Sequence, residues 1–520
     1  MISQSPVKHD LHVEHKRAAS NLLLIALIRR ESIEITMQLL LTITTLLLTV
    51  SAVATVETSN DLSHGYQNLV DWMQDNGGNV ENIIVAKSTF LGAGNALQTI
   101  ESRQKGDVLV TIPVHMLVTD ETARADSLVQ QHVMSFDFSI DSCLILTLYI
   151  MIEKLISQKN SKWINFFQTL PSINHNFNLP QFEWHAAGQE AQEALEVLFT
   201  APSIAAKMRE GAHIHELTLR KLNTTVFASL KRSYSHLTDV EILKTFLWAG
   251  SIVLTRSWSD AGGSIPGNCT MVPILDLLNH EDDAMGMFAM AFDDNPIVQA
   301  VGVVASKNIA AGSELVASYD PSFDPFYVPM EDDNGIPNKC MQDMLLGFGF
   351  LPLHSGRPWC FDVDFVISTV IFQDATLETL RNDLLMQVGT GPGRQYATKL
   401  KENDGNIPSA LLAVLRLSIS GEREMMLIQK RGNADAPFDL ATERQVLLLL
   451  KNTMVKAMST IPSAEDQDQE RMVAAREEGN DKMAIALEVR IHERRICEQT
   501  LEHVKKLWLR VMVDDKLWED

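Results

Sequence analysis

Four side chains that can bind or orient a polar ligand lie near the middle of this 520-residue chain. An apolar run that begins near Val272 ends in Asp276, Asn279 and His280, which offer a carboxylate, an amide and an imidazole. Further along the chain, a strand-like segment ends in Tyr319, whose phenol can both donate and accept a hydrogen bond. Apolar runs usually end in turn residues, so this pattern predicts a pocket that holds a polar ligand from several directions.

A metal site is the first alternative for this segment. His280 is followed directly by Glu281, Asp282 and Asp283, which are potential ligands. No second histidine is placed to complete the ligand shell, and adjacent acidic residues in a loop are usually solvated, so we predict no metal here. A calcium loop at residues 331–335 is also disfavoured, because the stretch lacks the ligand spacing and the distal glutamate of such loops.

Two other segments could contribute to the pocket. Residues 245–258 are predicted to form a buried helix, and Arg256 at its end could either reach a carboxylate ligand or complement the helix dipole. Residues 90–97 contain a turn in which Gly92 and Gly94 would let the backbone approach a ligand closely. No GxGxxG pattern or P-loop lysine follows this turn, so phosphate binding is not predicted.

The segments that must position these residues alternate between strand-like and helical patterns. Residues 60–118 and 270–320 contain short β-rich runs separated by turn signals. Residues 120–260 carry long amphipathic or apolar segments of helical period, and the chain is helical in pattern again from about residue 360. The acidic run at residues 465–470 is predicted to be a solvated connection between two helices.

These patterns predict an α+β protein with three parts. Residues 1–58 form an N-terminal extension, and residues 60–355 form a β-rich domain that is interrupted by a helical insert at about residues 120–260. An all-α domain follows at residues 360–520. A β-rich unit that is split by helices and followed by a helical domain is an uncommon order, and it narrows the choice of fold.

The composition excludes some classes of function. The formal net charge of −22 disfavours nucleic acid as a partner, because phosphate binding needs a concentrated basic surface. The same charge is compatible with a basic protein substrate, or with acidity that only keeps the protein soluble.

The cysteines are few and widely spaced. None is part of a CxxC pair and the count is odd, so neither a disulfide framework nor a structural zinc site is expected. Single buried or surface thiols are predicted instead. The five positions are Cys143, Cys269, Cys340, Cys360 and Cys497.

An apolar segment without charges occupies residues 37–54 and follows Arg29 and Arg30. It resembles a secretory signal peptide, although it is also long enough for a membrane anchor and could have no targeting role. Met37 could be the true start of the protein. A signal would direct the protein to the secretory pathway or an organelle, whereas the alternatives leave it membrane-anchored or cytoplasmic.

Together these segments resemble the SET-domain protein methyltransferases, in the branch of the Rubisco large-subunit lysine methyltransferase and the actin-histidine methyltransferase. Those proteins share a D-x-x-N-H signature, which fits residues 276–280, and a later G-x-E-L…S-Y segment, which fits residues 312–319. Their helical insert carries an S-x-W…L-P pattern, which fits residues 161–171, and a later P…W pair, which fits residues 180–184. The C-terminal helical region, notably residues 483–501, resembles the family's substrate-binding domain.

The resemblance implies an enzyme that transfers a methyl group from S-adenosylmethionine to a lysine, or alternatively a histidine, of a protein substrate. Tyr319 matches the family's catalytic tyrosine. The residues that match positions lying against the cofactor are Leu91, Gly92, Ala93, Arg256, Asp276, Leu277, Leu278, Asn279, His280, Phe348, Gly349 and Phe350. We expect a monomer that binds a protein with a basic segment, binds no nucleic acid, and contacts membranes only through an N-terminal anchor.

The chemistry of methyl transfer accounts for these residue types. The methyl carbon of a sulfonium needs a lone pair in line with it, so positioning supplies most of the acceleration. A lysine amine has an unperturbed pKa of roughly 10.4, and the site must desolvate it to favour the neutral form. A tyrosine hydroxyl and backbone carbonyls can orient the amine and accept weak C–H···O contacts, while aromatic walls suit a cationic product.

The chain departs from the family pattern at three positions. Asp320 follows the tyrosine where the family commonly has glycine, and Met341 takes the place of an asparagine after an insertion of about 17 residues. Phe348 lacks the hydroxyl of the usual tyrosine. The acidic side chains of Asp320 and residues 331–333 could attract a basic peptide or block the substrate channel. The alternative function is therefore a non-catalytic SET-like module that binds a protein.

Overall fold

The computed structural model describes most of the chain beyond its N-terminal extension. The described residues are 59–513, apart from 91–93, 137–139, 176, 182, 185–187, 259–266, 292–297, 320–339, 353–356, 368–371, 388–389, 391–394, 403–406, 432–433, 435–436 and 438. The apolar segment at residues 37–54, predicted as a signal or anchor, therefore lies outside the described residues, as do Asp320 and the acidic insertion. Within the described ranges, no helix has the length and apolar character needed to cross a membrane.

The largest sheet carries the strands that surround the candidate site. Its strands are β1 (Ile83–Lys87), β2 (Asn95–Thr99), β3 (Val108–Pro113), β7 (Asn279–Ala291), β8 (Val298–Val304) and β9 (Glu314–Ala317). Their spatial order is β1-β2-β9-β7-β8-β3, and all neighbours are antiparallel except β7 and β9. In that parallel pair, Asn279 lies opposite Val316 and His280 lies opposite Ala317. The register thus places the D-x-x-N-H segment beside the strand that leads to Tyr319.

A helical insert separates the early strands from the late strands, as the sequence predicts. Its helices are α3 (Asp120–Ala125), α4 (Ser127–Val129), α5 (Ser142–Ile152), α6 (Ile164–Phe167), α7 (Gln189–Thr200), α8 (Pro202–Leu222), α9 (Ala228–Ser233) and α10 (Asp239–Arg256). A small sheet of β4 (Val118–Thr119), β6 (Thr270–Met271) and β5 (Ser257–Trp258) lies at the ends of the insert. The helix α2 (Ser59–Asp75) precedes the first strand and is followed by a turn at Asn76 and Gly77.

The sequence determines both ends of α10. Thr238 and Glu241 form a reciprocal capping box, in which the Thr238 hydroxyl accepts from the Glu241 amide and the Glu241 carboxylate accepts from the Thr238 amide. The helix then runs through a largely buried apolar face and ends at Arg256. The cap and the buried face therefore fix the position at which this arginine leaves the helix.

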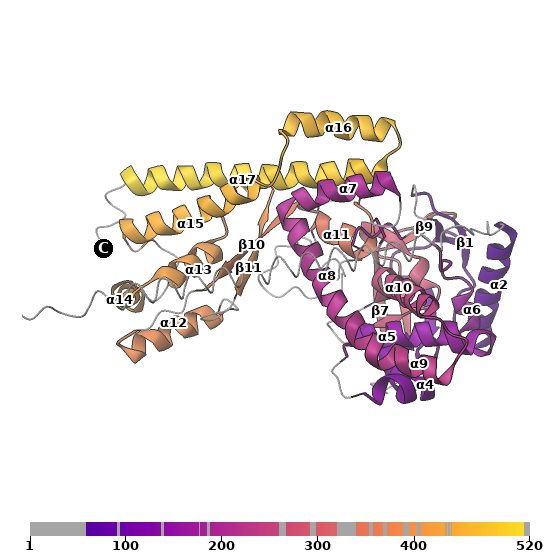
Figure 1. Cartoon of the computed structure of the whole chain (residues 1–520). Coiled ribbons are helices and arrows are strands. Elements are labelled where there is room, and N and C mark those ends of the chain that lie inside the picture. Colours follow the sequence, from indigo (N-terminus) through magenta and orange to yellow (C-terminus); the bar gives the residue numbers. More distant parts are fainter. Residues whose placement is uncertain are drawn as a thin grey trace, which may run out of the picture.

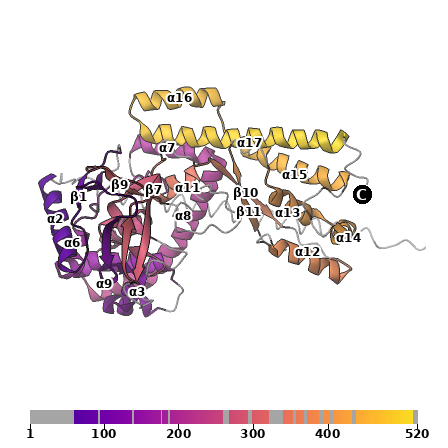
Figure 2. The ribbon, with the colours of Figure 1, turned by 180° about the vertical axis from the view of Figure 1, so that it is seen from behind.

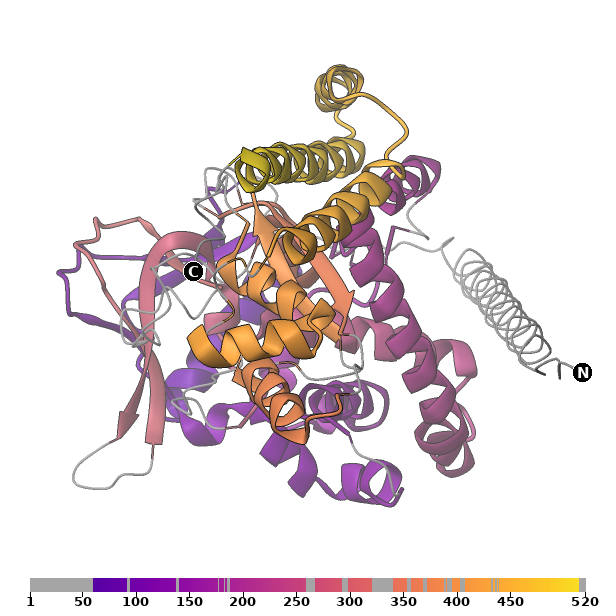
Figure 3. The same ribbon diagram turned by 90° about the vertical axis from the view of Figure 1, so that its left-hand side faces the viewer.

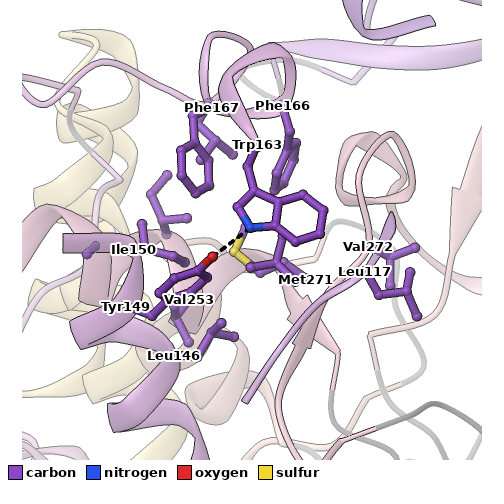
Figure 4. Packing of buried hydrophobic residues seen from close by; sticks show 14 of the residues in the cluster. Leu117, Leu146, Tyr149, Ile150, Trp163, Phe166, Phe167, Val253, Met271 and Val272 are labelled. Carbon is purple, nitrogen blue, oxygen red and sulfur yellow. Dashed lines mark hydrogen bonds between the residues drawn. The ribbon is translucent and has the colours of Figure 1, made fainter. Parts of the chain in front are cut away.

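The S-x-W motif of the insert anchors its core. Trp163 and Tyr149 are buried, and the indole Nε1–H of Trp163 donates to the Tyr149 hydroxyl at 2.8 Å (Figure 4). The Ser161 hydroxyl accepts from the Trp163 amide at 3.1 Å. The buried side chains labelled around this pair are Leu117, Leu146, Ile150, Phe166, Phe167, Val253, Met271 and Val272. Full burial of each such side chain contributes roughly 1.5–3 kcal/mol to the stability of the fold. The cluster therefore holds the insert against Met271 and Val272, which lead into the candidate site.

The C-terminal part of the chain is mainly helical, as predicted. Its helices are α11 (Met341–Phe348), α12 (Ala375–Gln387), α13 (Ser409–Ile419), α14 (Glu422–Arg431), α15 (Leu440–Met458), α16 (Glu465–Glu477) and α17 (Asp481–Val513). The helical pattern missed an antiparallel pair of strands, β10 (Cys360–Val366) and β11 (Gln395–Lys401). The signal was present, because buried Phe361 and Val363 alternate with Asp362.

The long helix α17 connects the two halves of the molecule. It packs against α15 and α16 of the C-terminal part and also against α7 of the insert. Figures 1 and 2 show that it extends from the C-terminal helices over α7, so the two halves share one continuous element. Figure 3 shows α16 on the outer side of α17, away from the rest of the molecule.

The prediction for the acidic run at residues 465–470 was wrong. These residues form the first turns of α16 and do not connect two helices as a solvated loop. Asp468 is completely buried, and its carboxylate accepts from the guanidinium of Arg490 on α17, which is also buried. A buried pair of opposite charges allows an acidic residue to face the core, and residue type alone does not reveal its partner.

The prediction of single thiols was also wrong for four of the five cysteines. Cys143 is bridged to Cys269, with their Cα atoms 5.2 Å apart, and Cys340 is bridged to Cys360, with their Cα atoms 5.8 Å apart. Only Cys497 is free, and its burial raises the pKa of its thiol. Pairing depends on proximity in the fold, and the sequence separation of 126 residues in the first bridge hides that proximity.

Candidate active site

Tyr319 lies two residues beyond β9 and contacts the start of β7 through both its side chain and its backbone. The hydroxyl donates to the main-chain carbonyl of Leu278 at 2.8 Å. The Tyr319 amide donates to Nδ1 of His280 at 3.1 Å, and the two rings lie with centroids 5.1 Å apart. The segments that the sequence analysis selected separately therefore meet at Tyr319.

The phenol of Tyr319 is neutral at physiological pH. Burial raises its pKa to about 12; the positive charge of Arg256 lowers it in part, and the negative charge of Asp276 raises it again. A neutral phenol that donates its proton to a carbonyl still has oxygen lone pairs that can accept a hydrogen bond. The group can therefore orient a polar ligand, but it is not a general base at neutral pH.

Two phenylalanines complete an aromatic cluster around this tyrosine. The ring centroids of Phe348 and Phe350 lie 4.7 Å and 6.3 Å from that of Tyr319. Gly349 between them ends α11 in the left-handed region, with φ of +79°. A Cβ atom at Gly349 would lie 2.2 Å from the carbonyl oxygen of Phe177, so no larger residue fits without movement of the backbone.

A segment of the insert holds the turn at the end of α11. The side-chain amide of Asn178 donates to the Gly349 carbonyl at 2.8 Å, and that of Gln181 donates to the Leu346 carbonyl at 2.6 Å. Trp184 is fully buried, and its indole N–H donates to Oδ1 of Asn178 at 3.0 Å. The predicted P…W motif therefore supports the turn, but Asn178 and Gln181 had no sequence signal of their own.

Arg256 and Asp276 contact each other. Nη1 of Arg256 donates to the Asp276 carboxylate at 2.9 Å and to its main-chain carbonyl at 3.1 Å. Burial raises the pKa of Asp276, whereas the guanidinium opposes this change and favours the charged form. From the sequence, Arg256 was expected to contact the carboxylate of a ligand or to complement the helix dipole. Among the described residues it contacts the carboxylate of Asp276, which is itself a predicted site residue.

The backbone between Val272 and Asn279 is strained at one position. Ile274 has φ of +71°, which is a rare conformation for a β-branched residue. A short 3₁₀ turn (Leu275–Leu277) follows it. The side chains of Leu277 and Leu278 are buried in the core, so these two residues offer the site only their main-chain groups. The strain thus occurs four residues before Leu278, whose carbonyl accepts from Tyr319.

A carboxylate outside the predicted site residues holds the amide of Asn279. Nδ2 of Asn279 donates to Glu314 at 2.7 Å and to the Ser88 hydroxyl at 3.1 Å. The other carboxylate oxygen of Glu314 accepts from the Thr89 amide at 2.6 Å and from its hydroxyl at 2.7 Å. In the sequence, Glu314 was recognisable only as part of the G-x-E-L motif, and Ser88 and Thr89 carried no signal.

Tyr66 of α2 is another residue that the sequence did not reveal. Its hydroxyl donates to the Thr169 carbonyl at 3.3 Å and accepts from Nδ2 of Asn95 at 3.0 Å. Burial raises the pKa of Tyr66, the bond from Asn95 lowers it, and the charges of Asp276 and Arg256 act on it in opposite directions. Tyr66 therefore lies within electrostatic reach of that pair.

The turn at Leu91, Gly92 and Ala93 lies outside the described residues, although Ser88 on its N-terminal side is held by Glu314. In the part of the chain that the structure describes, no three side chains of histidine, cysteine, aspartate or glutamate gather as metal ligands would.

Both the fold and the C-terminal part of the sequence are similar to known proteins. Residues 373–496 match the family model described as Rubisco LSMT substrate-binding. The structure superposes on that of the SET domain of LSMT bound to lysine and AdoHcy with a TM-score of 0.68 and 18% identity, covering 88% of this chain and 94% of that chain. For LSMT bound to AdoMet the TM-score is 0.59 with 17% identity, covering 86% and 93% of the two chains. The chain thus has a SET-like α+β fold followed by a helical substrate-binding region of the Rubisco LSMT type.

Among curated proteins, SET domain-containing protein 4 of Mus musculus is 24% identical to this chain over 207 residues. The match covers 38% of this chain and 44% of the mouse protein, so it spans less than half of that relative. The predicted resemblance to SET-domain protein methyltransferases of the Rubisco LSMT branch is confirmed, and so is the predicted fold class. The boundaries of the domains and the roles of the individual site residues stay predictions.

Proposed function

We propose that this chain is an S-adenosylmethionine-dependent protein N-methyltransferase whose substrate is a lysine side chain, with histidine as the alternative. The observation that carries the proposal is the contact between the Tyr319 hydroxyl and the Leu278 carbonyl within a cluster of aromatic rings. A neutral phenol and a main-chain carbonyl, placed side by side among aromatic rings, form a site that can orient an amine.

The chemistry of the surrounding residues fits S-adenosylmethionine. Both N–H bonds made by Asn279 are directed to protein acceptors, so its amide oxygen is the group that it can offer to the ammonium of an amino acid. The rings of Phe348 and Phe350 suit a flat base or a sulfonium. We propose that the cofactor is held by Leu91, Gly92, Ala93, Arg256, Asp276, Leu277, Leu278, Asn279, His280, Phe348, Gly349 and Phe350. LSMT, which has the same fold, has been solved with AdoMet and with AdoHcy.

When bound, S-adenosylmethionine supplies an electrophilic methyl group on its sulfonium sulfur. Tyr319 acts as the catalytic residue by orienting the substrate amine, because the Leu278 carbonyl fixes the direction of its hydroxyl and a phenol oxygen is able to accept a hydrogen bond from an amine. The phenol oxygen and the carbonyl can also accept weak C–H···O contacts from a polarised methyl group. Aromatic rings beside a bound lysine amine would displace water from it, which favours the neutral, nucleophilic form of the amine.

Two observations favour lysine as the substrate. The aromatic cluster of Tyr319, Phe348 and Phe350 suits an alkylammonium product through cation–π attraction. LSMT has been solved with lysine and with methyl-lysine in its complexes. The formal net charge of −22 suits a basic segment on the protein substrate.

The domain organisation that accompanies this proposal follows the sequence prediction. Residues 60–355 would carry out the chemistry, with the insert at about residues 120–260 supporting the site. The helical region at residues 360–520 would hold the protein substrate, in agreement with the family model that matches residues 373–496. Residues 1–58 would be an extension outside the catalytic part.

The competing function is a SET-like module that binds a protein without catalysis. Phe348 favours this alternative, because it contacts Tyr319 but lacks a hydroxyl for a second hydrogen bond to an amine. Calorimetric titration of the folded chain with S-adenosylmethionine separates the two functions. Heat that saturates at one equivalent of S-adenosylmethionine supports the methyltransferase. If well-folded protein does not bind S-adenosylmethionine, only the non-catalytic module remains as an explanation.

A further inference from the structure

Glu314 is the residue at which three segments of the candidate site meet. Its carboxylate contacts Ser88 and Thr89 after β1, and Asn279 at the start of β7, while its own strand leads to Tyr319. We propose that Glu314 is a positioning residue that orients Asn279 and residues 88–90 for cofactor binding. The proposal rests on the proposed function and assigns to that site a residue that does not itself touch the substrate.

The charge of Glu314 determines how the amide of Asn279 is oriented. An ionised carboxylate only accepts hydrogen bonds, so the Asn279 side chain must present its NH2 group at 2.7 Å. The second N–H of the same group goes to the Ser88 hydroxyl, which in turn donates to Glu314 at 2.8 Å. With both N–H groups engaged, Asn279 offers a ligand only an acceptor, which is the polarity that an ammonium group requires.

The second oxygen of Glu314 fixes the backbone that enters the predicted cofactor turn. It accepts from both the amide and the hydroxyl of Thr89, at 2.6 Å and 2.7 Å. The Ser88 hydroxyl also accepts from the amide of Phe90 at 3.0 Å. Residues 88–90 are therefore held by four hydrogen bonds that depend directly or indirectly on one carboxylate, immediately before Leu91.

The ionised state of Glu314 is consistent with this geometry. Burial by itself would raise the pKa of Glu314, but the hydrogen bonds from Asn279, Thr89 and Ser88 outweigh that effect and lower the pKa. A glutamine at position 314 has almost the same shape, but its NH2 group would face either the Asn279 NH2 or the donors of Thr89. The substitution Glu314→Gln therefore tests the polarity of the contact with little change in volume.

The experiment compares wild-type protein and Glu314→Gln with a matched control, Glu241→Gln. Glu241 accepts from the amide and hydroxyl of Thr238 at 2.9 Å and 2.8 Å, so it makes the same kind of contact at the exposed start of α10. Calorimetry with S-adenosylhomocysteine gives the dissociation constant, and thermal unfolding identifies the temperature range in which each variant is folded. Steady-state kinetics at saturating cofactor separates KM from kcat.

The proposal predicts that Glu314→Gln raises the dissociation constant roughly tenfold or more, while kcat at saturating cofactor changes little. Glu241→Gln should leave the dissociation constant unchanged. In a double-mutant cycle, Glu314→Gln should have a smaller effect on binding when Asn279 is already alanine, because the two residues act together.

Two outcomes would overturn the assignment of Glu314. One is an unchanged dissociation constant in folded Glu314→Gln, and the other is an effect equal to that of Glu241→Gln. Additive effects in the cycle would show that Glu314 does not act through Asn279. If the wild-type protein itself does not bind S-adenosylhomocysteine, the proposed function fails, and that result is distinct from a failure at Glu314.

Discussion

The hydroxyl of Tyr319 donates a hydrogen bond to the main-chain carbonyl of Leu278, with the two oxygens 2.8 Å apart. The contact joins the end of β9 to the residue before β7, and the parallel register of these strands makes it possible. It also fixes the direction of the phenol proton.

The pH profile of methyl transfer should contain no step from Tyr319. Its pKa of about 12 keeps the phenol protonated throughout the range in which the protein can be assayed. With a lysine substrate, the rate at subsaturating substrate should rise with pH as the amine loses its proton, whose unperturbed pKa is roughly 10.4. Stopped assays between about pH 6 and about pH 11, a range that brackets the unperturbed pKa values of histidine and lysine, provide the measurement. A profile that levels off near the pKa of a histidine would contradict lysine as the substrate.

Gly349→Ala should destabilise the protein strongly. The new methyl group would meet the Phe177 carbonyl oxygen at 2.2 Å, and alanine is also strained at φ of +79°. We expect a loss of roughly 3 kcal/mol or more in the free energy of unfolding, measured by urea denaturation. The matched control is Gly347→Ala in the same helix, where a Cβ has no neighbour within 4 Å. That variant should be neutral or up to about 1 kcal/mol more stable, because alanine favours the helix. Equal effects of the two substitutions would contradict the account of this turn.

Four of the five cysteines should be protected from alkylation. In unfolded, unreduced protein only Cys497 should react, whereas all five should react after reduction. Mass spectrometry of peptides after labelling gives the answer directly. Reduction should also lower the unfolding temperature. In the loop-entropy model, the bridge from Cys340 to Cys360 lowers the entropy of the unfolded chain, and this stabilises the folded protein by about 3 kcal/mol. Labelling of more than one cysteine before reduction would contradict the two bridges.

Asp343 should make the protein sensitive to acid. It accepts from Lys207 and from Lys399, each at 2.7 Å, and so ties α11 to α8 and β11. Burial raises the pKa of Asp343, but the two lysines more than offset this and lower it from 3.8 to about 2. Between these two pH values the unfolded chain binds more protons than the folded protein does. The contribution of Asp343 to the free energy of unfolding is therefore complete above pH 3.8 and is lost as the pH falls to about 2.

As the pH falls from 3.8 to about 2, Asp343 should account for a loss of about 2 kcal/mol in the free energy of unfolding. Urea denaturation at a series of pH values measures this loss. Asp343→Asn should be less stable at pH 7, because both lysines lose a charged partner. It should also lose less stability than the wild-type protein between about pH 4 and pH 2. If the two proteins show the same change over that range, the ion pairs are not the source of the acid sensitivity.

The sequence predicted the segments of the site better than the contacts within it. Asp276, Asn279, His280 and Tyr319 were found because polar residues that end an apolar run are unusual, and the parallel pairing of β7 with β9 brings them together. The same reasoning could not assign Glu314, because an isolated glutamate in a strand is ordinary until its partners are known.

Long-range pairing was the part of the fold that residue patterns could not reveal. Asp468 in an acidic run and Cys143 far from Cys269 both have partners that only the folded chain brings within reach. By contrast, the strands β10 and β11 were missed although the alternation from Phe361 to Phe365 was visible in the sequence. The helical pattern of the longer neighbouring segments dominated the prediction there.

The most direct test of the account is methyl transfer by the purified protein and by Tyr319→Phe. Each is incubated with a cell extract and isotopically labelled S-adenosylmethionine, and labelled residues are identified by mass spectrometry. The account predicts labelled lysine, or alternatively histidine, with the wild-type protein, and a loss of roughly a hundredfold or more with Tyr319→Phe, although both proteins fold and bind the cofactor. Equal labelling by the two proteins would contradict the role of Tyr319, and no labelling by wild-type protein that binds the cofactor would contradict the proposed enzyme.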